Sequence, residues 1–295
     1  MMLLRRVGLF LATNLAVLIL LGLVLSVLQH VFGVQLGNNG VLLVFAALIG
    51  FGGSIISLLL SKTLAKRSTG AHVIVTPRNE MEGWLVGTIQ RQAEVLGLKT
   101  PEVAIYDAPE INAFATGASR NNSLVAVSTG LLRNMDRNEA EAVLGHEMSH
   151  VANGDMVTMA LIQGVLNTFV IFLSRVVGRV LDAALSGTRD DSRPGFFYYI
   201  IVMVLDLVFG LLASMVAMAF SRWREFRADA GGARLAGRDK MIAALQRLSL
   251  NQGQSTLPSQ IRAFGIAGGM ASGLQRLMRS HPPLQERIEA LRRSA

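Results

Sequence analysis

The composition of this 295-residue chain lies between that of a soluble protein and that of a protein wholly within a membrane. Hydrophobic residues make up 51% of the chain and charged residues 16%, against about a quarter charged in an average soluble domain. This hydrophobicity excludes a disordered chain. The chain has no cysteine, which excludes disulfides, a thiol nucleophile and a cysteine-bound metal. We therefore expect bilayer helices and one soluble domain, with any metal ion held by His, Asp or Glu.

Four long apolar segments predict transmembrane helices, at residues 7–28, 41–60, 156–174 and 196–220. Their lengths suit the hydrocarbon core of a bilayer. The first segment follows two arginines, as a signal peptide would. Its apolar region is too long for a signal peptide, however, and no A-x-A cleavage pattern follows it. We therefore expect a retained helix and four spans.

Small and polar residues within these segments leave two interpretations open. The glycine-rich run at residues 50–54 indicates either close packing against another helix or simple flexibility. Asp206 in the fourth segment is expected near mid-membrane, at a depth similar to that of Asn167 in the third. A carboxylate in a membrane is a candidate functional group. A structural hydrogen bond across a helix hairpin is the favoured interpretation here.

Basic residues flanking the segments predict the orientation of the chain in the membrane. Lys and Arg lie before the first segment and after the second, and none lies in the loop at 30–40. The N-terminus and the stretch after the second segment are therefore expected in the cytoplasm, and an even number of spans returns the C-terminus there. The loop at 175–195 carries four Arg and three Asp and gives only a weak signal.

The sequence predicts an α+β, mainly helical protein in four parts. Residues 1–60 form two transmembrane helices and residues 156–220 a transmembrane hairpin, whereas 61–155 and 221–295 form the two parts of one cytoplasmic domain. Apolar patterns in the first part predict a small sheet with strands at 72–76, 102–107, 112–116 and 123–128. A helix is predicted over 80–96, and a second over 140–152 after a capping-box pattern at Asp136 and Glu139. The last part is predicted to be helical, with a glycine-rich loop at 265–273.

The net charge of +8 is concentrated after the fourth apolar segment. Residues 221–295 carry a net charge of +8, whereas residues 61–155 carry −2. A basic chain can bind nucleic acid, but no aromatic-rich strand or nucleic-acid motif accompanies this charge. We expect attraction to the anionic lipid surface of the cytoplasmic leaflet, and no nucleic acid as a partner.

The string His146-Glu147-Met148-Ser149-His150 predicts a zinc site. Two histidines four residues apart share one face of a helix and can bind the same ion. Glu147 is placed to take a proton from a metal-bound water that attacks a peptide carbonyl. An incidental pair of histidines is the weaker interpretation.

Zinc requires a third protein ligand, and a hairpin of two spans would bring one back to the same side of the membrane. Glu225 lies about as far beyond the fourth segment as His150 lies before the third. Asp229 follows Glu225 by one helical turn and is placed to orient a ligand imidazole. The alternatives are an ion pair of Glu225 with neighbouring arginines and an ordinary helix salt bridge of Asp229.

Three motifs together resemble the HtpX family of bacterial inner-membrane zinc proteases, which is of the gluzincin type and is more distantly similar to type I CaaX prenyl proteases. They are HEMSH, R-E-F-R-A-D around Glu225, and N-A-F-A-T-G from Asn112. The resemblance covers essentially the whole chain, including the four spans, and implies a zincin-like domain with one Zn²⁺ per chain. It assigns zinc binding to the two motif histidines and Glu225, and the general base to Glu147.

The resemblance also implies roles for Asn112 and His281, which match family residues bordering the catalytic cleft. The resemblance implies that they bind substrate or stabilise the oxyanion. Without the resemblance, Asn112 would be interpreted as a turn residue and His281 as a residue at the start of a helix. The expected function is hydrolysis of misfolded or damaged membrane proteins, or of unfolded polypeptides, in stress-linked quality control. The expected location is the bacterial inner membrane, with the catalytic domain and both termini in the cytoplasm.

Two other functions compete for the same sequence features. An intramembrane zinc protease carries its motif within an apolar span, but the polar stretch at 133–141 precedes this one. A non-proteolytic membrane scaffold or transporter with a metal site receives slight support from Asp206 and from the glycines of the second segment. The intact Glu147 and the lack of an internal repeat count against it. The sequence gives neither the natural substrates nor the oligomeric state.

Overall fold

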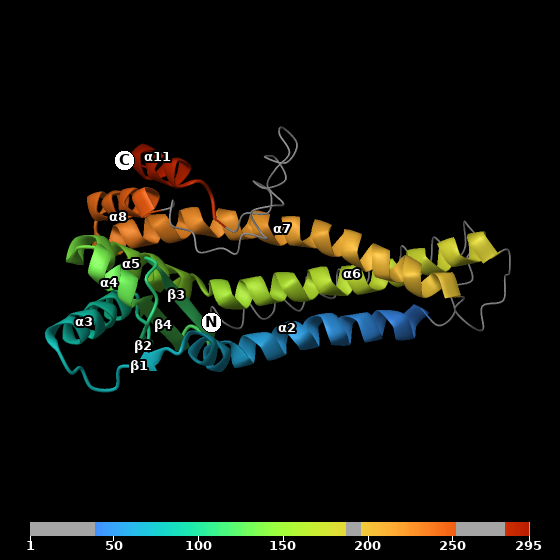
Figure 1. Ribbon diagram of the computed structural model, residues 1–295, viewed down its shortest axis with the longest axis horizontal. Helices are drawn as coiled ribbons and strands as arrows, with labels where there is room; N and C mark the ends of the chain where they lie inside the picture. Colours follow the sequence, from blue (N-terminus) through green and yellow to red (C-terminus); the bar gives the residue numbers. More distant parts are fainter. Residues whose placement is uncertain (1–38, 187–195, 252–280, 295) are drawn as a thin grey trace. The chain divides into compact units, whose positions relative to one another are not determined.

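The computed structural model describes residues 39–186, 196–251 and 281–294, and it is mainly helical with one small sheet (Figure 1). The chain divides into two compact units, Met1–Ser57 with Ala160–Ala217, and Leu58–Met159 with Met218–Ala295. The predicted span at 7–28 and the predicted glycine-rich loop at 265–273 lie outside the described residues.

Three helices in the described part of the chain are long and apolar enough to cross a membrane. They are α2 (Asn39–Thr69), α6 (Asp155–Ser186) and α7 (Phe196–Ala236). They contain the second, third and fourth predicted segments, and each extends beyond its segment. The prediction of a loop from residue 175 is wrong, because α6 continues to Ser186 through a stretch without proline. No break separates the fourth segment from Glu225, since both lie on α7.

The first unit has one close helix contact and one ion pair that bear on the sequence predictions. A Cβ atom at Gly50 of α2 would lie 2.7 Å from the backbone nitrogen of Thr168 in α6, whereas one at Gly52 or Gly53 would meet nothing within 4 Å. Of the three glycines in this run, Gly50 is therefore the one that packs closely against α6. Asp206 Oδ1 lies 3.4 Å from Arg175 Nη1 on α6, so this carboxylate does bridge the two helices, although its partner is an arginine.

The sheet in the second unit has four strands in the order β1-β2-β4-β3. Their bounds are His72–Val73, Glu102–Tyr106, Asn122–Ser128 and Ala113–Ser119 in that order across the sheet. β2 and β4 are parallel, and the other two pairs are antiparallel. β1 is shorter than predicted, and β3 runs on to Ser119, so the turn to β4 is shorter than predicted. β3 forms one edge of the sheet.

The helix that carries the HEMSH motif is α5 (Arg137–Asn153), and other elements of the second unit pack against two of its sides. The predicted capping box is confirmed, with the Asp136 side chain accepting from the Glu139 backbone and the Glu139 side chain from the Asp136 backbone. Gly154 ends the helix with φ 66°, a conformation that suits glycine. These local signals fix where α5 begins and ends, and so which turn carries the motif.

The other helices that the structure describes within the second unit are α3 (Glu80–Val95), α4 (Thr129–Asn134), α8 (Arg238–Asn251) and α11 (Leu284–Arg293). Of these, α3 and α8 contact α5, and α11 packs on α8 (Figure 1). Leu144, Met148 and Val151 of α5 pack with α3 and the sheet. Ala140 and Val143 pack with α8 and α11. Burial on both sides therefore holds the motif helix in place.

Candidate metal centre

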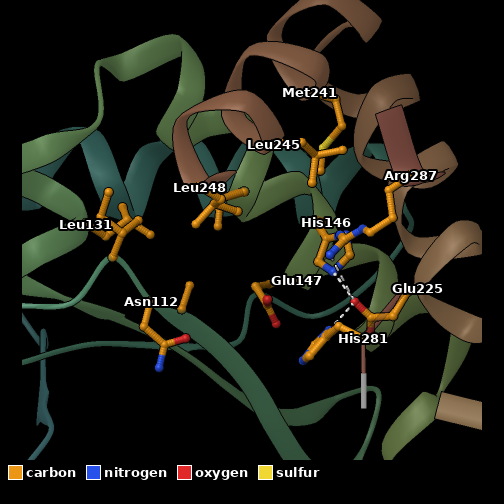
Figure 2. A pocket seen from close by; sticks show the side chains of 13 residues that line it. Asn112, Leu131, His146, Glu147, Glu225, Met241, Leu245, Leu248, His281 and Arg287 are labelled. Atoms are coloured by element: carbon orange, nitrogen blue, oxygen red, sulfur yellow. Dashed lines mark hydrogen bonds and ion pairs between the residues drawn. The ribbon is translucent and has the colours of Figure 1, made fainter. Parts of the chain in front are cut away.

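The two motif histidines and Glu225 come together at one point, and Figure 2 shows His146 and Glu225 there. The Nε2 atoms of His146 and His150 lie 3.1 Å apart. The Glu225 carboxylate approaches them with Oε2 at 3.5 Å from His146 Nε2 and Oε1 at 3.3 Å from His150 Nε2. Glu225 has no exposed surface, and His146 and His150 are 7% and 9% exposed. The three side chains can therefore meet one ion in a site shielded from solvent.

The donor set and its spacing fit zinc. Ligands about 2.0–2.1 Å from a tetrahedral ion are separated from one another by about 3.3 Å, close to the measured nitrogen–nitrogen and nitrogen–oxygen distances. Glu225 Oε1 is also buried without a hydrogen bond, an arrangement that proteins rarely leave uncompensated. Two imidazoles and a carboxylate are the three ligands found in several catalytic zinc sites.

The imidazole of His146 lies against a carboxylate that is itself held in place. Asp229 Oδ1 lies 2.9 Å from His146 Nδ1. Arg287 donates two hydrogen bonds to Asp229, from Nε to Oδ2 at 2.7 Å and from Nη2 to Oδ1 at 2.6 Å. Asp229 and Arg287 are both buried. The structure thus places Asp229 beside the imidazole, and the ion pair of Asp229 is with a residue of α11.

His150 has an equivalent partner that sequence reasoning missed. Asp155 Oδ2 lies 2.7 Å from His150 Nδ1, and Asp155 is 3% exposed. With Nδ1 held by a carboxylate, Nε2 is the nitrogen that faces the other ligands. Asp155 comes five residues after the motif and starts α6, so the sequence indicates only an acidic first turn of a helix. Arg287 was also missed, because nothing local marks an arginine so far along the chain.

The carboxylates around the imidazoles favour positive charge at this point. Burial lowers the pKa of His150, but the carboxylates of Asp155 and Glu225 beside its ring outweigh burial and raise the pKa to about 9. Burial acts on His146 in the same way, and Asp229 and Glu225 raise its pKa against that effect. Protons and a metal cation are therefore drawn to the same nitrogens.

Glycines set the distance between the two helices that carry these residues. A Cβ atom at Gly232 of α7 would lie 2.9 Å from the backbone nitrogen of His146, and one at Gly231 would lie 2.8 Å from Ser149 Cβ. A Cβ atom at Gly145 of α5 would lie 3.3 Å from the Gly232 backbone. The backbones of α5 and α7 are therefore in contact within one turn of Asp229.

The other predicted site residues lie around a cavity beside the three ligands. Glu147, Asn112 and His281 all line it together with His146 and Glu225 (Figure 2). Asn112 directly precedes the edge strand β3, and its backbone N–H donates to Ser128 Oγ at 3.1 Å. His281 Nδ1 lies 2.7 Å from Glu225 Oε2. His281 therefore contacts a candidate ligand directly, which its reading as a helix-start residue does not account for.

Comparisons with known proteins agree with this arrangement. The sequence model described as "Peptidase family M48" matches residues 79–295. The chain is 70% identical over 290 residues to "Protease HtpX" of Xanthomonas campestris pv. campestris (strain B100), covering 98% of each. It is 68% identical over 288 residues to "Protease HtpX" of Xanthomonas oryzae pv. oryzae (strain MAFF 311018), covering 98% of this chain and 97% of that protein.

The comparison with solved structures finds a similar fold. The crystal structure of S. mikatae Ste24p is similar, with a TM-score of 0.60 at 19% sequence identity. The similarity covers 98% of this chain, and this chain spans 65% of the length of Ste24p. At this identity the likeness bears on the fold alone.

Proposed function

The chain belongs to peptidase family M48, and from that premise we propose that it is a zinc-dependent endopeptidase that acts at the cytoplasmic face of a bacterial inner membrane. Its resemblance to the HtpX family is confirmed by the relatives of that name, and it is a membrane-bound metalloprotease. The proposal adds that the metal is zinc, that individual residues have the roles given below, and that four spans place the catalytic unit in the cytoplasm.

The observation that carries the proposal is the buried cluster of His146, His150 and Glu225 with Glu147 beside it. These three residues would hold zinc, which when bound supplies a positive charge for the peptide carbonyl and lowers the pKa of water. Glu147 would accept a proton from the attacking water on its carboxylate and deliver it to the amine that leaves. Asn112 and His281 would bind the substrate backbone or the oxyanion from the rim of the same cavity.

We propose misfolded or damaged membrane proteins and unfolded polypeptides as the substrates. The apolar helices would hold the enzyme in the same bilayer as membrane substrates. The basic stretch at 221–295 would hold the catalytic unit near anionic lipid headgroups. A scaffold or transporter is not favoured, because the similarity to the relative named as a protease covers 98% of both chains.

The test is proteolysis by the purified full chain in mild detergent, with unfolded casein as the probe and metal content measured on the same samples. Glu147→Gln should retain zinc and lose activity by about 100-fold or more, whereas Glu94→Gln, an exposed glutamate of α3, should match the wild type. Glu225→Ala should lower zinc occupancy. Casein cleavage that persists in Glu147→Gln would exclude the mechanism, and full zinc content in Glu225→Ala would exclude Glu225 as a ligand.

A further inference from the structure

A cavity that is partly open to the surface adjoins the metal centre on the side of Glu147. Its volume is about 120 Å³, and one end of it is formed by His146, Glu147 and Glu225 (Figure 2). Because the candidate general base faces this space, whatever occupies the cavity lies next to the bond that is cut. The cavity lies wholly within the second unit.

The wall away from the metal ligands is apolar. It is formed by Leu131 of α4, Val143 of α5, and Met241, Leu245 and Leu248 of α8. The three α8 residues are four and three positions apart, so they lie on one face of that helix. Figure 2 shows Leu131, Leu245 and Leu248 across the space from Glu147. A polar or charged group placed among these side chains would lose its hydration without gaining a partner.

We propose that this cavity is the specificity pocket of the enzyme, and that it binds the side chain of a large apolar residue, Leu, Met or Phe, directly next to the peptide bond that is cut. The inference rests on the proposed proteolytic function and names the substrate feature that the site selects. A cavity of about 150 Å³ lined by Leu, Ile and Phe side chains holds a benzene molecule. The present cavity, at about 120 Å³, therefore suits one such side chain and leaves little space for Trp.

The pocket also gives the proposed substrates a physical basis. Large apolar residues are buried in a folded soluble protein, and they are exposed when a protein is misfolded. An apolar pocket beside the general base therefore selects against folded substrates without a separate recognition domain.

Leu248 is the residue of choice for a test, because it lines the pocket and is only partly buried. Met241 and Leu245 are 1% and 0% exposed and belong to the core around α5, so their replacement would also disturb folding. Leu250 offers a matched control, since it lies on the same helix, is 77% exposed, and is not part of the pocket wall.

The experiment maps cleavage sites in peptides produced from a bacterial proteome by a glutamate-specific endopeptidase, using the full-length zinc-loaded enzyme in detergent. Wild type should favour Leu, Met or Phe over Ala at one position flanking the cut bond by about 10- to 100-fold. Leu248→Phe should reduce the preference for Phe over Ala by about 10-fold, and Leu248→Ala should raise Phe and Trp relative to Leu. Leu250→Phe and Leu250→Ala should leave the profile of cleaved sites unchanged.

The outcomes separate this inference from the proposed function. If Glu147-dependent cleavage occurs but wild type shows small, polar or charged residues at both flanking positions, the pocket assignment is overturned and the protease assignment stands. The same conclusion follows if Leu248 variants with normal zinc content cut with the wild-type profile. If wild type shows no cleavage that depends on Glu147, the proposed function itself fails. Because the wild-type profile alone tests the pocket, a poorly folded variant does not prevent a decision.

Discussion

Replacing Gly232 with alanine should loosen the metal centre without replacing any ligand. The added Cβ would lie 2.9 Å from the backbone nitrogen of His146, 3.1 Å from Met241 Sδ and 3.2 Å from His146 Cα, whereas ordinary contact is 3.4–4 Å. The Met241 side chain can move, but the backbone of α5 cannot. The two helices must therefore separate by several tenths of an ångström.

The expected magnitude follows from two opposing effects. Overpacking of a well-packed site costs about 1–3 kcal/mol, and the better helix propensity of alanine offsets up to about 1 kcal/mol. We expect a net loss of about 1–2 kcal/mol in the free energy of unfolding. Glu225 and Asp229 would move with α7, and displaced residues of this kind lower metal affinity by about 10- to 100-fold.

The assay is competition for zinc between the purified protein and a chelator of known affinity, with thermal unfolding followed in the same detergent. Gly83→Ala is the matched control, because Gly83 lies in α3 and a Cβ there would meet nothing within 4 Å. That variant should keep wild-type zinc affinity and unfold at the same or a higher temperature. Wild-type zinc affinity in Gly232→Ala would refute the reasoning that this contact sets the spacing of the ligands.

Three further predictions concern residues that hold the site or the sheet. Asp155→Asn should weaken zinc binding by about 10- to 100-fold in the chelator assay. The control Asp239→Asn, which replaces an exposed acid in the first turn of α8, should not weaken it. Equal zinc affinity in the two variants would contradict a role of Asp155 in orienting His150. Arg287→Lys should lower kcat while changing the unfolding temperature little, because lysine cannot donate the paired hydrogen bonds to Asp229. An unchanged kcat would contradict a role of Arg287 in holding Asp229. Burial raises the pKa of Glu102, but hydrogen bonds from two α2 lysines lower it below the usual 4.5. The stability this carboxylate contributes is therefore present above about pH 4.5 and is lost as pH falls through the folded-state pKa. Accordingly the gap in unfolding temperature between wild type and Glu102→Gln should narrow on acidification, and a constant gap would show that the ion pairs contribute nothing.

The parts of the site that are encoded locally are those that the sequence predicts well. The capping box at Asp136 and Glu139 and the four-residue spacing of the histidines are both set within a few turns of α5. Glu225 could be inferred because a hairpin of two apolar segments returns the chain to the same side. Asp229 could be inferred from the helical spacing that follows Glu225.

The parts that the sequence does not predict depend on contacts between distant residues or on how far a helix continues. Arg287 reaches Asp229 from α11, and no periodicity marks that pairing. Asp155 serves as a partner of His150 only because the chain turns at Gly154 and starts α6 immediately. The charged residues after residue 174 favour a loop in the sequence, whereas α6 continues through them to Ser186. The apolar pocket could not be inferred, since α4, α5 and α8 meet there only in the folded domain.

The continuity of α7 has a consequence for when the enzyme becomes active during its synthesis. The histidines lie before the apolar parts of α6 and α7, and Glu225 lies after both, on the helix that contains the fourth apolar segment. A nascent chain that has made the HEMSH helix but not the hairpin lacks the third ligand and Asp229. Proteolytic activity is therefore expected only after the hairpin has been synthesised and inserted. Such an order would keep a partly made chain from cutting other proteins.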